Sequence, residues 1–425
     1  MDTTLGRAAA TRAILAGLCA SLVGIGLARF AYTPLIPPLI EAHWFAAQDV
    51  VFLGAANLVG YLAGALAGRP LAARLGSRRT LQLMMALASL AFFACALPLS
   101  VAWFFGWRFL SGLSGGIIMV LAALSILPQV PPERRGVASG AIFLGLGLGI
   151  AASGTVVPLL LNEGLAATWA GLGALSLLLT LISWRWWPQA AAAAPAASAG
   201  RAPAHAGFAL KLIYAQYALK AVGLVPMMVF LVDYIARGLH LGSHTAALFW
   251  VVYGLGATAG PMLYGVLGDR FGIDTATRIA LVLQILAAGV LVLAHGLAGL
   301  LAATFVIGTY PPGIVPLTLG RIRHTLPQDV PAQGAAWSRA TTIFALFQAL
   351  AGYAYSWIFA ATGGDHRVLM EIGAAALAVA LVSDLLLARA AWAAQAADAT
   401  DQAARLSASP PVSNARGGTQ AGRAR

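Results

Sequence analysis

Apolar stretches of roughly 20 residues, the length that crosses a ~30 Å hydrocarbon core as a helix, recur along the whole chain. They are rich in Leu, Ala, Val and Gly, and they are much longer than the alternating strands of a membrane barrel, so they are expected to be helices. Only 9% of the 425 residues are charged, whereas a soluble globular protein carries roughly 25%. The sequence therefore predicts an all-α membrane protein with twelve transmembrane helices.

The basic residues are distributed unevenly between alternate loops. If the N-terminus is placed in the cytoplasm, most of the 26 Lys and Arg residues fall at cytoplasmic tails, loops and helix ends, and only Arg237 and Arg367 lie on the other side. Because positive charge is retained on the cytoplasmic side of a membrane, both termini are predicted to be cytoplasmic. The net charge of +12 is then a sign of topology, and no nucleic-acid partner is expected.

A segment rich in alanine and proline, PQAAAAAPAASAGRAPAHAG, separates the sixth predicted span from the seventh. Such a composition is typical of a flexible linker. The predicted organisation is a cytoplasmic N-terminus (1–12), a first six-helix bundle (13–187), a cytoplasmic linker (188–210), a second six-helix bundle (211–390) and a disordered cytoplasmic tail (391–425).

The two predicted bundles share landmarks at one constant offset in the sequence. The pairs are Gly60 and Gly256, Gly64 and Gly260, Leu71 and Leu267, Arg74 and Arg270, Gly76 and Gly272, Gly112 and Gly308, and Pro131 and Pro327. They fall at equivalent places, namely the second helix, the loop after it, the fourth helix and the loop after that. Duplicated halves of this kind are a transporter architecture.

The loop between the eighth and ninth predicted spans reads Gly265-Val-Leu-Gly-Asp269-Arg270-Phe-Gly272. It resembles the G-x-L-x-D-R-x-G loop of the major facilitator superfamily, in which this loop is a latch of the cytoplasmic gate. The equivalent loop of the first half keeps Arg74 and Gly76 but has Ala73 at the acidic position. Glycine at 76 and 272 would permit a tight turn. A plain turn with cytoplasmic arginines remains an alternative for either loop alone.

Further resemblances extend over nearly every span. Arg108-Phe-Leu-Ser-Gly112 in the fourth span resembles the superfamily's R-x-x-x-G motif. The stretches from Gly24 to Pro37 and from Val225 to Leu239 resemble the YbfB/YjiJ-type branch, whose substrates are largely unassigned. The resemblance implies a secondary transporter with the major facilitator fold, located as a monomer in the bacterial cytoplasmic membrane. It implies transport of a small molecule and no enzymatic activity.

In that fold, the first, fourth, seventh and tenth spans line a central cavity. Arg29, Arg108 and Lys220 then lie on three cavity helices, and no acidic residue lies near the middle of the four. We expect a positive cavity and an organic anion as solute, because arginine binds carboxylates bidentately. Tyr32 and Tyr310 are expected to add hydrogen bonds or an aromatic wall. For Arg108, an alternative is a side chain that snorkels to the outer surface.

Asp233 is the best candidate for a residue that binds a coupling proton, since it is titratable and lies on a cavity helix. The alternative is a local ion pair with Arg237, one helical turn away. Uniport also remains open.

Other functions are weighed against this interpretation. The fifth span lacks the Gly-Pro pair of the antiporter signature, which disfavours a proton-antiport drug or metabolite exporter without excluding it. A receptor or scaffold that retains the carrier fold is the alternative from a different class. Cys19 and Cys95 both lie in apolar segments without a Cys/His cluster, so no metal site or cofactor is expected.

Overall fold

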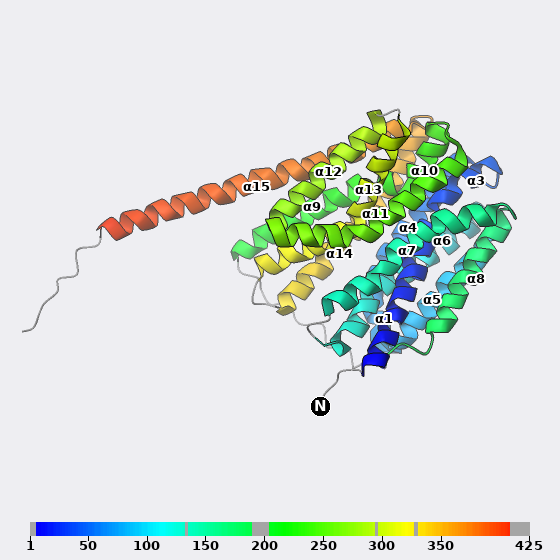
Figure 1. The fold of residues 1–425 in the computed structure, drawn as a ribbon, viewed down its shortest axis with the longest axis horizontal. Coiled ribbons are helices and arrows are strands. Elements are labelled where there is room, and N and C mark those ends of the chain that lie inside the picture. Colours follow the sequence, from blue (N-terminus) through cyan, green and yellow to red (C-terminus); the bar gives the residue numbers. More distant parts are fainter. Residues whose placement is uncertain (1–5, 132–134, 189–203, 294–295, 327–329, 409–425) are drawn as a thin grey trace, which may run out of the picture. The chain divides into compact units, whose positions relative to one another are not determined.

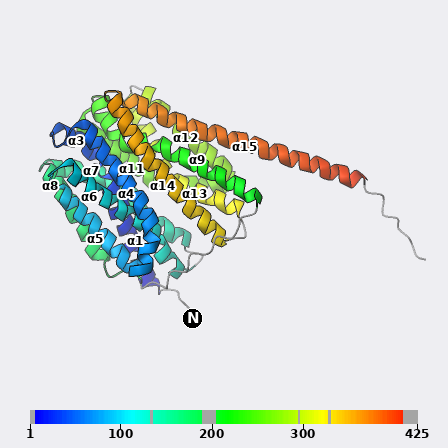
Figure 2. The same cartoon turned by 180° about the vertical axis from the view of Figure 1, so that it is seen from behind.

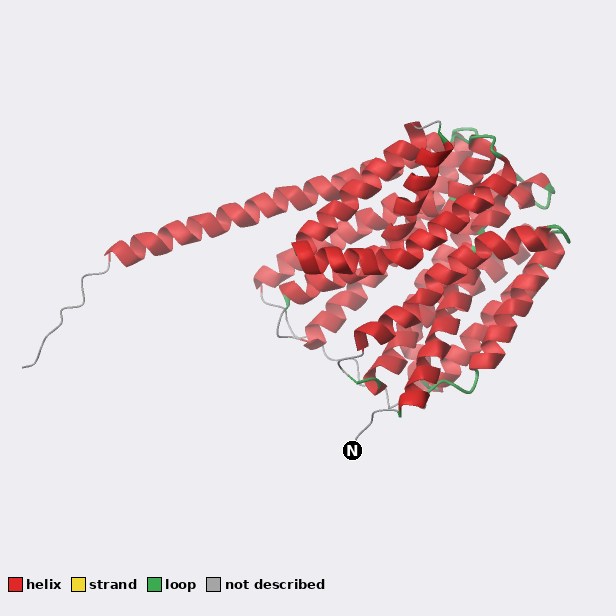
Figure 3. Cartoon of the chain, in the orientation of Figure 1, coloured by secondary structure: helices red, strands yellow, loops and turns green. Residues whose placement is uncertain are grey.

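The computed structural model describes residues 6–131, 135–188, 204–293, 296–326 and 330–408. These residues form helices joined by short loops, and none of them lies in a strand (Figure 3). Most of the predicted linker 188–210 lies outside the described residues, but α9 already begins at Ala204, earlier than the predicted start at 211. Pro327, which was paired with Pro131 in the sequence comparison, also lies outside them.

The first half starts with an interrupted helix and continues with five long ones. The interrupted helix is α1 (Arg7–Ser21), η1 (Leu22–Leu27), α2 (Ala28–Phe30), η2 (Thr33–Leu35) and α3 (Ile36–Glu41). The others are α4 (Ala47–Leu75), α5 (Ser77–Cys95), α6 (Val101–Ile126) with the short η3 (Leu127–Gln129), α7 (Arg135–Leu161) and α8 (Leu165–Ser183).

The second half repeats this order. Its interrupted helix is α9 (Ala204–Val229), α10 (Leu231–Asp233) and η5 (Tyr234–Gly238). The long helices that follow are α11 (Gly242–Phe271), α12 (Ile273–Leu293), α13 (Leu297–Thr325), α14 (Val330–Ala361) and α15 (His366–Ala408).

Eleven helices of the described chain are long and apolar enough to cross a membrane. The remaining long helix, α5, is less apolar on average, because its 19 residues include Arg78, Arg79 and Gln82 near one end. Its counterpart in the second half, α12, is one of the eleven. The molecule is thus a multi-pass α-helical membrane protein.

The chain divides into two units, residues 1–381 and residues 382–425. The second unit contains the end of α15, which is helical as far as Ala408. This differs from the disorder predicted from residue 391 onward. The difference has a local cause, since the stretch is rich in alanine, the residue with the highest helix propensity.

The two ends of the helical bundle are distinguished by their loops. One end, here called the N-terminal end, carries the start of α1 and the turns at Gly76 and Gly272 (Figure 1). Both glycines have positive φ values, 80° and 79°, so the predicted tight turns are present at both places. The opposite end, here called the far end, carries Glu41 and the loop before α11.

Close backbone contacts recur in the two halves at the offset found in the sequence. A Cβ atom added at Gly64 would lie 2.1 Å from the carbonyl oxygen of Leu113, and one at Gly260 would lie 2.1 Å from that of Thr309. The same correspondence holds for Gly60 against Phe109 and Gly256 against Phe305, and for Gly112 against Asn57 and Gly308 against Tyr253. Glycine therefore lets α4 approach α6, and α11 approach α13, as small residues do in membrane bundles.

We expect Gly64→Val to destabilise the fold strongly, by about 1–3 kcal/mol or more, because the new side chain would overlap the backbone of α6. The measurement is the thermal unfolding temperature and yield of monodisperse protein in detergent. Gly289→Val in α12 is the matched control, since a Cβ there meets nothing within 4 Å. Equal loss of stability in both variants would contradict the assigned close packing.

Candidate functional site

The first helix of each half is broken at its far-end part. In the first half, a π-helix (Leu22–Leu27) and a 3-10 turn containing Pro34 interrupt the helix. In the second, α9 contains Pro226 and stops at Val229, and a π-helix follows from Tyr234. Broken helices at corresponding positions of two halves mark the solute site in many transporters, because they free backbone groups for binding.

The carbonyl group of Ala28, next to the first break, collects three donors from neighbouring helices. Arg108 donates from an Nη atom over 3.0 Å, Ser111 donates from Oγ over 3.0 Å, and Asn57 donates from Nδ2 over 3.4 Å. These bonds hold α2 against α4 and α6.

Arg108 is almost completely buried, with 2% of its surface exposed. Its guanidinium carbon lies 4.2 Å from the ring centroid of Tyr32, a cation–π contact. The Tyr32 hydroxyl donates to the carbonyl oxygen of Val50 over 2.6 Å, which fixes the ring. The Nε atom of Arg108 is buried without a hydrogen-bond partner. Arg108 therefore faces the interior of the bundle and does not snorkel to the surface.

Arg29 follows Ala28 directly in α2. Its guanidinium carbon is 5.4 Å from the ring centroid of Phe30 and 5.0 Å from that of Tyr61. One Nη atom lies 3.4 Å from the sulfur of Met228, a weak acceptor, and its Nε atom has no partner. Within the described chain, neither Arg29 nor Arg108 forms an ion pair with a carboxylate. Arg108, which is buried, and Arg29, which is partly buried, thus have no carboxylate counterion there, and removing such charges from water is costly.

Both arginines border one small cavity between the halves. It has about 10 Å³ in which the centre of a water molecule can lie, enough for about one water molecule. Its lining comes from the two broken helices, α4 and α6, and consists of Arg29, Phe30, Tyr32, Thr33, Gly54, Asn57, Leu58, Arg108, Met228 and Val229. The structure therefore brings together three of the six predicted pathway residues, Arg29, Tyr32 and Arg108.

The other predicted pathway residues lie elsewhere. Lys220 in α9 and Tyr310 in α13 are buried, at 3% and 0% exposure, but neither lines this cavity. Sequence reasoning missed Asn57 and Met228. Asn57 is a lone amide within an apolar span, and that signal was available. Met228 gave no signal, because methionine is ordinary in a span.

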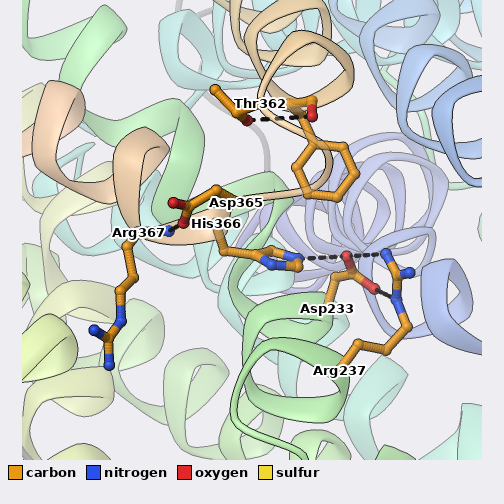
Figure 4. A network of polar contacts seen from close by, with 7 residues as sticks. Asp233, Arg237, Thr362, Asp365, His366 and Arg367 are labelled. Atoms are coloured by element: carbon orange, nitrogen blue, oxygen red, sulfur yellow. Dashed lines mark hydrogen bonds and ion pairs between the residues drawn. The ribbon is translucent and has the colours of Figure 1, made fainter.

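Asp233 belongs to a polar cluster at the far end (Figure 4). It is fully buried, and both its carboxylate oxygens accept hydrogen bonds from Arg237, each over 2.5 Å. The ion pair with Arg237, which was the alternative to a coupling role for Asp233, is present in the structure. The cluster also contains His366 at the start of α15, whose Nε2 atom lies 2.6 Å from Oδ2 of Asp233. This partner was not predicted, because it lies 133 residues away along the chain.

A larger cavity of about 510 Å³ lies beside this cluster and is bordered by both halves. Arg237, His240 and His366 line it from the second half, and Gln48 lines it from the first. Arg237 and His366 thus border this cavity, whereas Asp233 itself does not line it.

The two halves contact each other toward the far end. Thr33 donates to the carbonyl oxygen of Met228 over 3.2 Å, and Ser243 donates to Glu41 over 3.2 Å. Phe52 also packs on Tyr353 with ring centroids 4.9 Å apart. This contact belongs to α4 and α14, which lie side by side (Figure 2).

Helices α7 and α11 lie side by side, and their contact changes along their length (Figure 1). A Cβ at Gly154 would lie 2.8 Å from the Val251 nitrogen, and one at Gly147 would lie 2.8 Å from the Thr258 Cα. One heptad closer to the N-terminal end, α7 carries Gly140 and α11 carries Gly265, where a Cβ would meet nothing within 4 Å. The two helices are therefore in close contact at the levels of Gly154 and Gly147. They separate before the level of Gly140 and Gly265, here called the third layer.

The predicted gate loops lie at that parted end. Arg74, Asp269 and Arg270 are exposed, and none of the three has an ion-pair partner in the part of the chain that the structure describes. Gly265, Gly76 and Gly272 are likewise free of close neighbours.

Two helical halves whose first helices are broken at corresponding positions have the architecture of a secondary transporter. The family described as the uncharacterised MFS-type transporter YbfB matches residues 21–385, and the chain belongs to this family of the major facilitator superfamily. A crystal structure of a D-xylose–proton symporter is similar in fold, with a TM-score of 0.66 and 16% identity, covering 87% of this chain and 96% of that one. No curated protein matches the sequence. The predicted family and fold class are confirmed.

Proposed function

We propose that this transporter carries a small organic anion across the bacterial cytoplasmic membrane by alternating access. The observation that carries the proposal is a pair of arginines, the buried Arg108 and the partly buried Arg29, which share one cavity and have no carboxylate partner among the described residues. The protein moves small molecules by virtue of its family, and the arginine pair selects the charge of the molecule.

The arginine pair is better explained by a ligand than by packing. Cation–π contacts contribute about 0.5–2 kcal/mol each, whereas removing a charged group from water costs several kcal/mol. A solute carboxylate would accept hydrogen bonds from the Nε atoms of both side chains and neutralise their charge. It would bind to side chains that are already held in place by the protein.

The proposed topology places the N-terminal end in the cytoplasm, following the distribution of basic residues. The far-end contacts then make the present arrangement closed to the outside. In the opposite arrangement, Gly140 and Gly265 would close the third layer between α7 and α11. The Asp269–Arg270 loop and the Arg74 loop would then find partners at that end. We propose a monomer as the working unit within the lipid bilayer.

The test is ligand-dependent thermal stabilisation of the purified full chain, screened over organic anions, organic cations and sugars. We expect stabilisation by carboxylates alone, and its disappearance in Arg29→Gln. Stabilisation by a cation or an uncharged sugar, with carboxylates inert, would overturn the anionic assignment and leave the transporter assignment intact.

We also propose that a coupling proton binds at Asp233, whose carboxylate is held by His366 and Arg237 beside the far-end cavity. In Asp233→Asn we expect solute uptake driven by a pH gradient to fall by at least about tenfold, because a proton can no longer be exchanged at this carboxylate. Exchange of solute for solute, which needs no net proton movement, should persist.

The matched control for this prediction is Glu371→Gln, which removes an exposed acidic residue from α15. Both uptake and exchange should be unchanged in it. If Asp233→Asn retains a full response to the pH gradient, Asp233 serves only as a structural partner of Arg237 and His366.

A further inference from the structure

The orientation of the Asn57 amide is fixed by its surroundings. Its Nδ2 atom donates to the carbonyl oxygens of Ala28 and Arg108, over 3.4 and 3.3 Å, and lies 3.4 Å from Oγ of Ser111. Turning the amide over would place Oδ1 against two carbonyl oxygens, which only accept hydrogen bonds. The assignment of nitrogen and oxygen therefore follows from the network.

The Oδ1 atom of Asn57 is consequently an acceptor without a partner. Asn57 is 2% exposed, its Oδ1 is buried and unpaired, and the residue lines the arginine cavity. The nearby hydroxyl groups do not supply the missing donor, because Ser111 donates to Ala28 and Thr33 donates to Met228. A buried acceptor left unpaired costs about 1–3 kcal/mol.

Three residues that line the cavity thus carry unpaired polar atoms of two kinds. Arg29 and Arg108 each have an unpaired Nε donor, and Asn57 has one unpaired acceptor. A simple carboxylate would pair with the donors only, and its negative oxygens would gain nothing from the Asn57 carbonyl. A solute that satisfies the whole set must carry a hydrogen-bond donor close to its anionic group.

We propose that the solute is a hydroxy-substituted carboxylate. Its carboxylate binds Arg29 and Arg108, and its hydroxyl donates to Oδ1 of Asn57. This inference rests on the proposed anion transport and narrows its substrate class. An ammonium group would also donate, but its full positive charge would lie beside two guanidinium groups and be repelled. Phe30, Leu58 and Val229, which are the apolar aromatic and aliphatic residues of the lining, suit a short hydrocarbon part.

The experiment measures affinity by thermal stabilisation of the full chain with matched probes. The pairs are lactate and propionate, malate and succinate, and mandelate and phenylacetate, with 2-methoxypropionate and alanine as further probes. In the wild type, we expect at least one hydroxy acid to bind about tenfold or more tightly than its deoxy partner. The methoxy analogue keeps the oxygen but lacks the donor, so it should lose this preference.

The variant Asn57→Leu should reduce the hydroxy preference, the ratio of hydroxy-acid to deoxy-acid affinity, to less than about twofold. Arg12→Gln, an exposed arginine of α1, is the control variant. If Asn57→Leu fails to fold, the comparison of hydroxy, methoxy and deoxy probes on the wild type decides the matter alone.

The outcomes separate this inference from the proposed function. Carboxylates that bind equally with and without the hydroxyl, and that depend on Arg29, would overturn the inference and leave anion transport standing. Tighter binding of alanine than lactate would also overturn it, in favour of an amino acid. Failure of every carboxylate, with binding of a sugar or a cation, would overturn both.

Discussion

Arg29→Met is expected to reduce transport of the anion strongly while leaving the protein as stable as the wild type or more so. The guanidinium group has only a sulfur atom as acceptor and lacks a counterion among the described residues, so its loss removes a desolvated charge at little cost in bonding. Loss of one charged hydrogen-bond partner for the solute is worth roughly 1.5–3 kcal/mol, so transport should fall by about 10- to 100-fold.

Arg108→Gln should reduce transport to a similar degree and should also destabilise the fold. This side chain donates to Ala28 and stacks on Tyr32, so its removal affects the helix break itself. The measurements are initial uptake into proteoliposomes and the unfolding temperature, with Arg12→Gln as control.

A less stable Arg29→Met variant with normal transport would show that Arg29 acts in packing alone.

The second large effect concerns α7 and α11, where bulky residues at two glycines should trap opposite conformations. Gly254→Trp would force the halves apart at the far end, because even a Cβ there lies 2.3 Å from the Ala151 nitrogen. Gly140→Trp meets nothing within 4 Å in the present arrangement, so the protein should fold as observed but be unable to close its N-terminal end. Both variants should lose at least about 90% of transport, since alternating access needs both states.

Single cysteines can report which end is open, after Cys19 and Cys95 are replaced by alanine. Relative to the unblocked parent, Gly254→Trp should increase maleimide labelling of Ser243→Cys at the far end and reduce labelling of Gly265→Cys at the other. Gly140→Trp should have the reverse effect. Gly289→Trp, in open space on α12, is the control. Identical labelling patterns in the two trapped variants would contradict the proposed closure of the third layer.

Much of the fold followed from the sequence because its causes are local. Long apolar spans, positive-φ glycines at 76 and 272 and the repeated glycines of α4 and α11 all act within one helix or one turn. The helical end of α15 was missed for a related reason. A composition read as disorder there also has high helix propensity.

The site was predicted only in part. A charged side chain in a span is conspicuous, so Arg29 and Arg108 were found, and their convergence followed from the resemblance to a known fold. Lys220 is equally conspicuous but lies away from the arginine cavity. The partner of Asp233 across the bundle, His366, and the orientation of Asn57 depend on tertiary packing, which no local pattern encodes.

The central claim is that the protein moves an anion through a site built on Arg29 and Arg108. Counterflow tests it most directly: proteoliposomes loaded with an unlabelled carboxylate that stabilises the protein are diluted into trace labelled carboxylate. A transient accumulation of label is predicted for the wild type and Arg12→Gln, and a rate of accumulation at least about tenfold lower for Arg29→Met. The absence of accumulation in the wild type, or accumulation at the wild-type rate in Arg29→Met, would contradict the account.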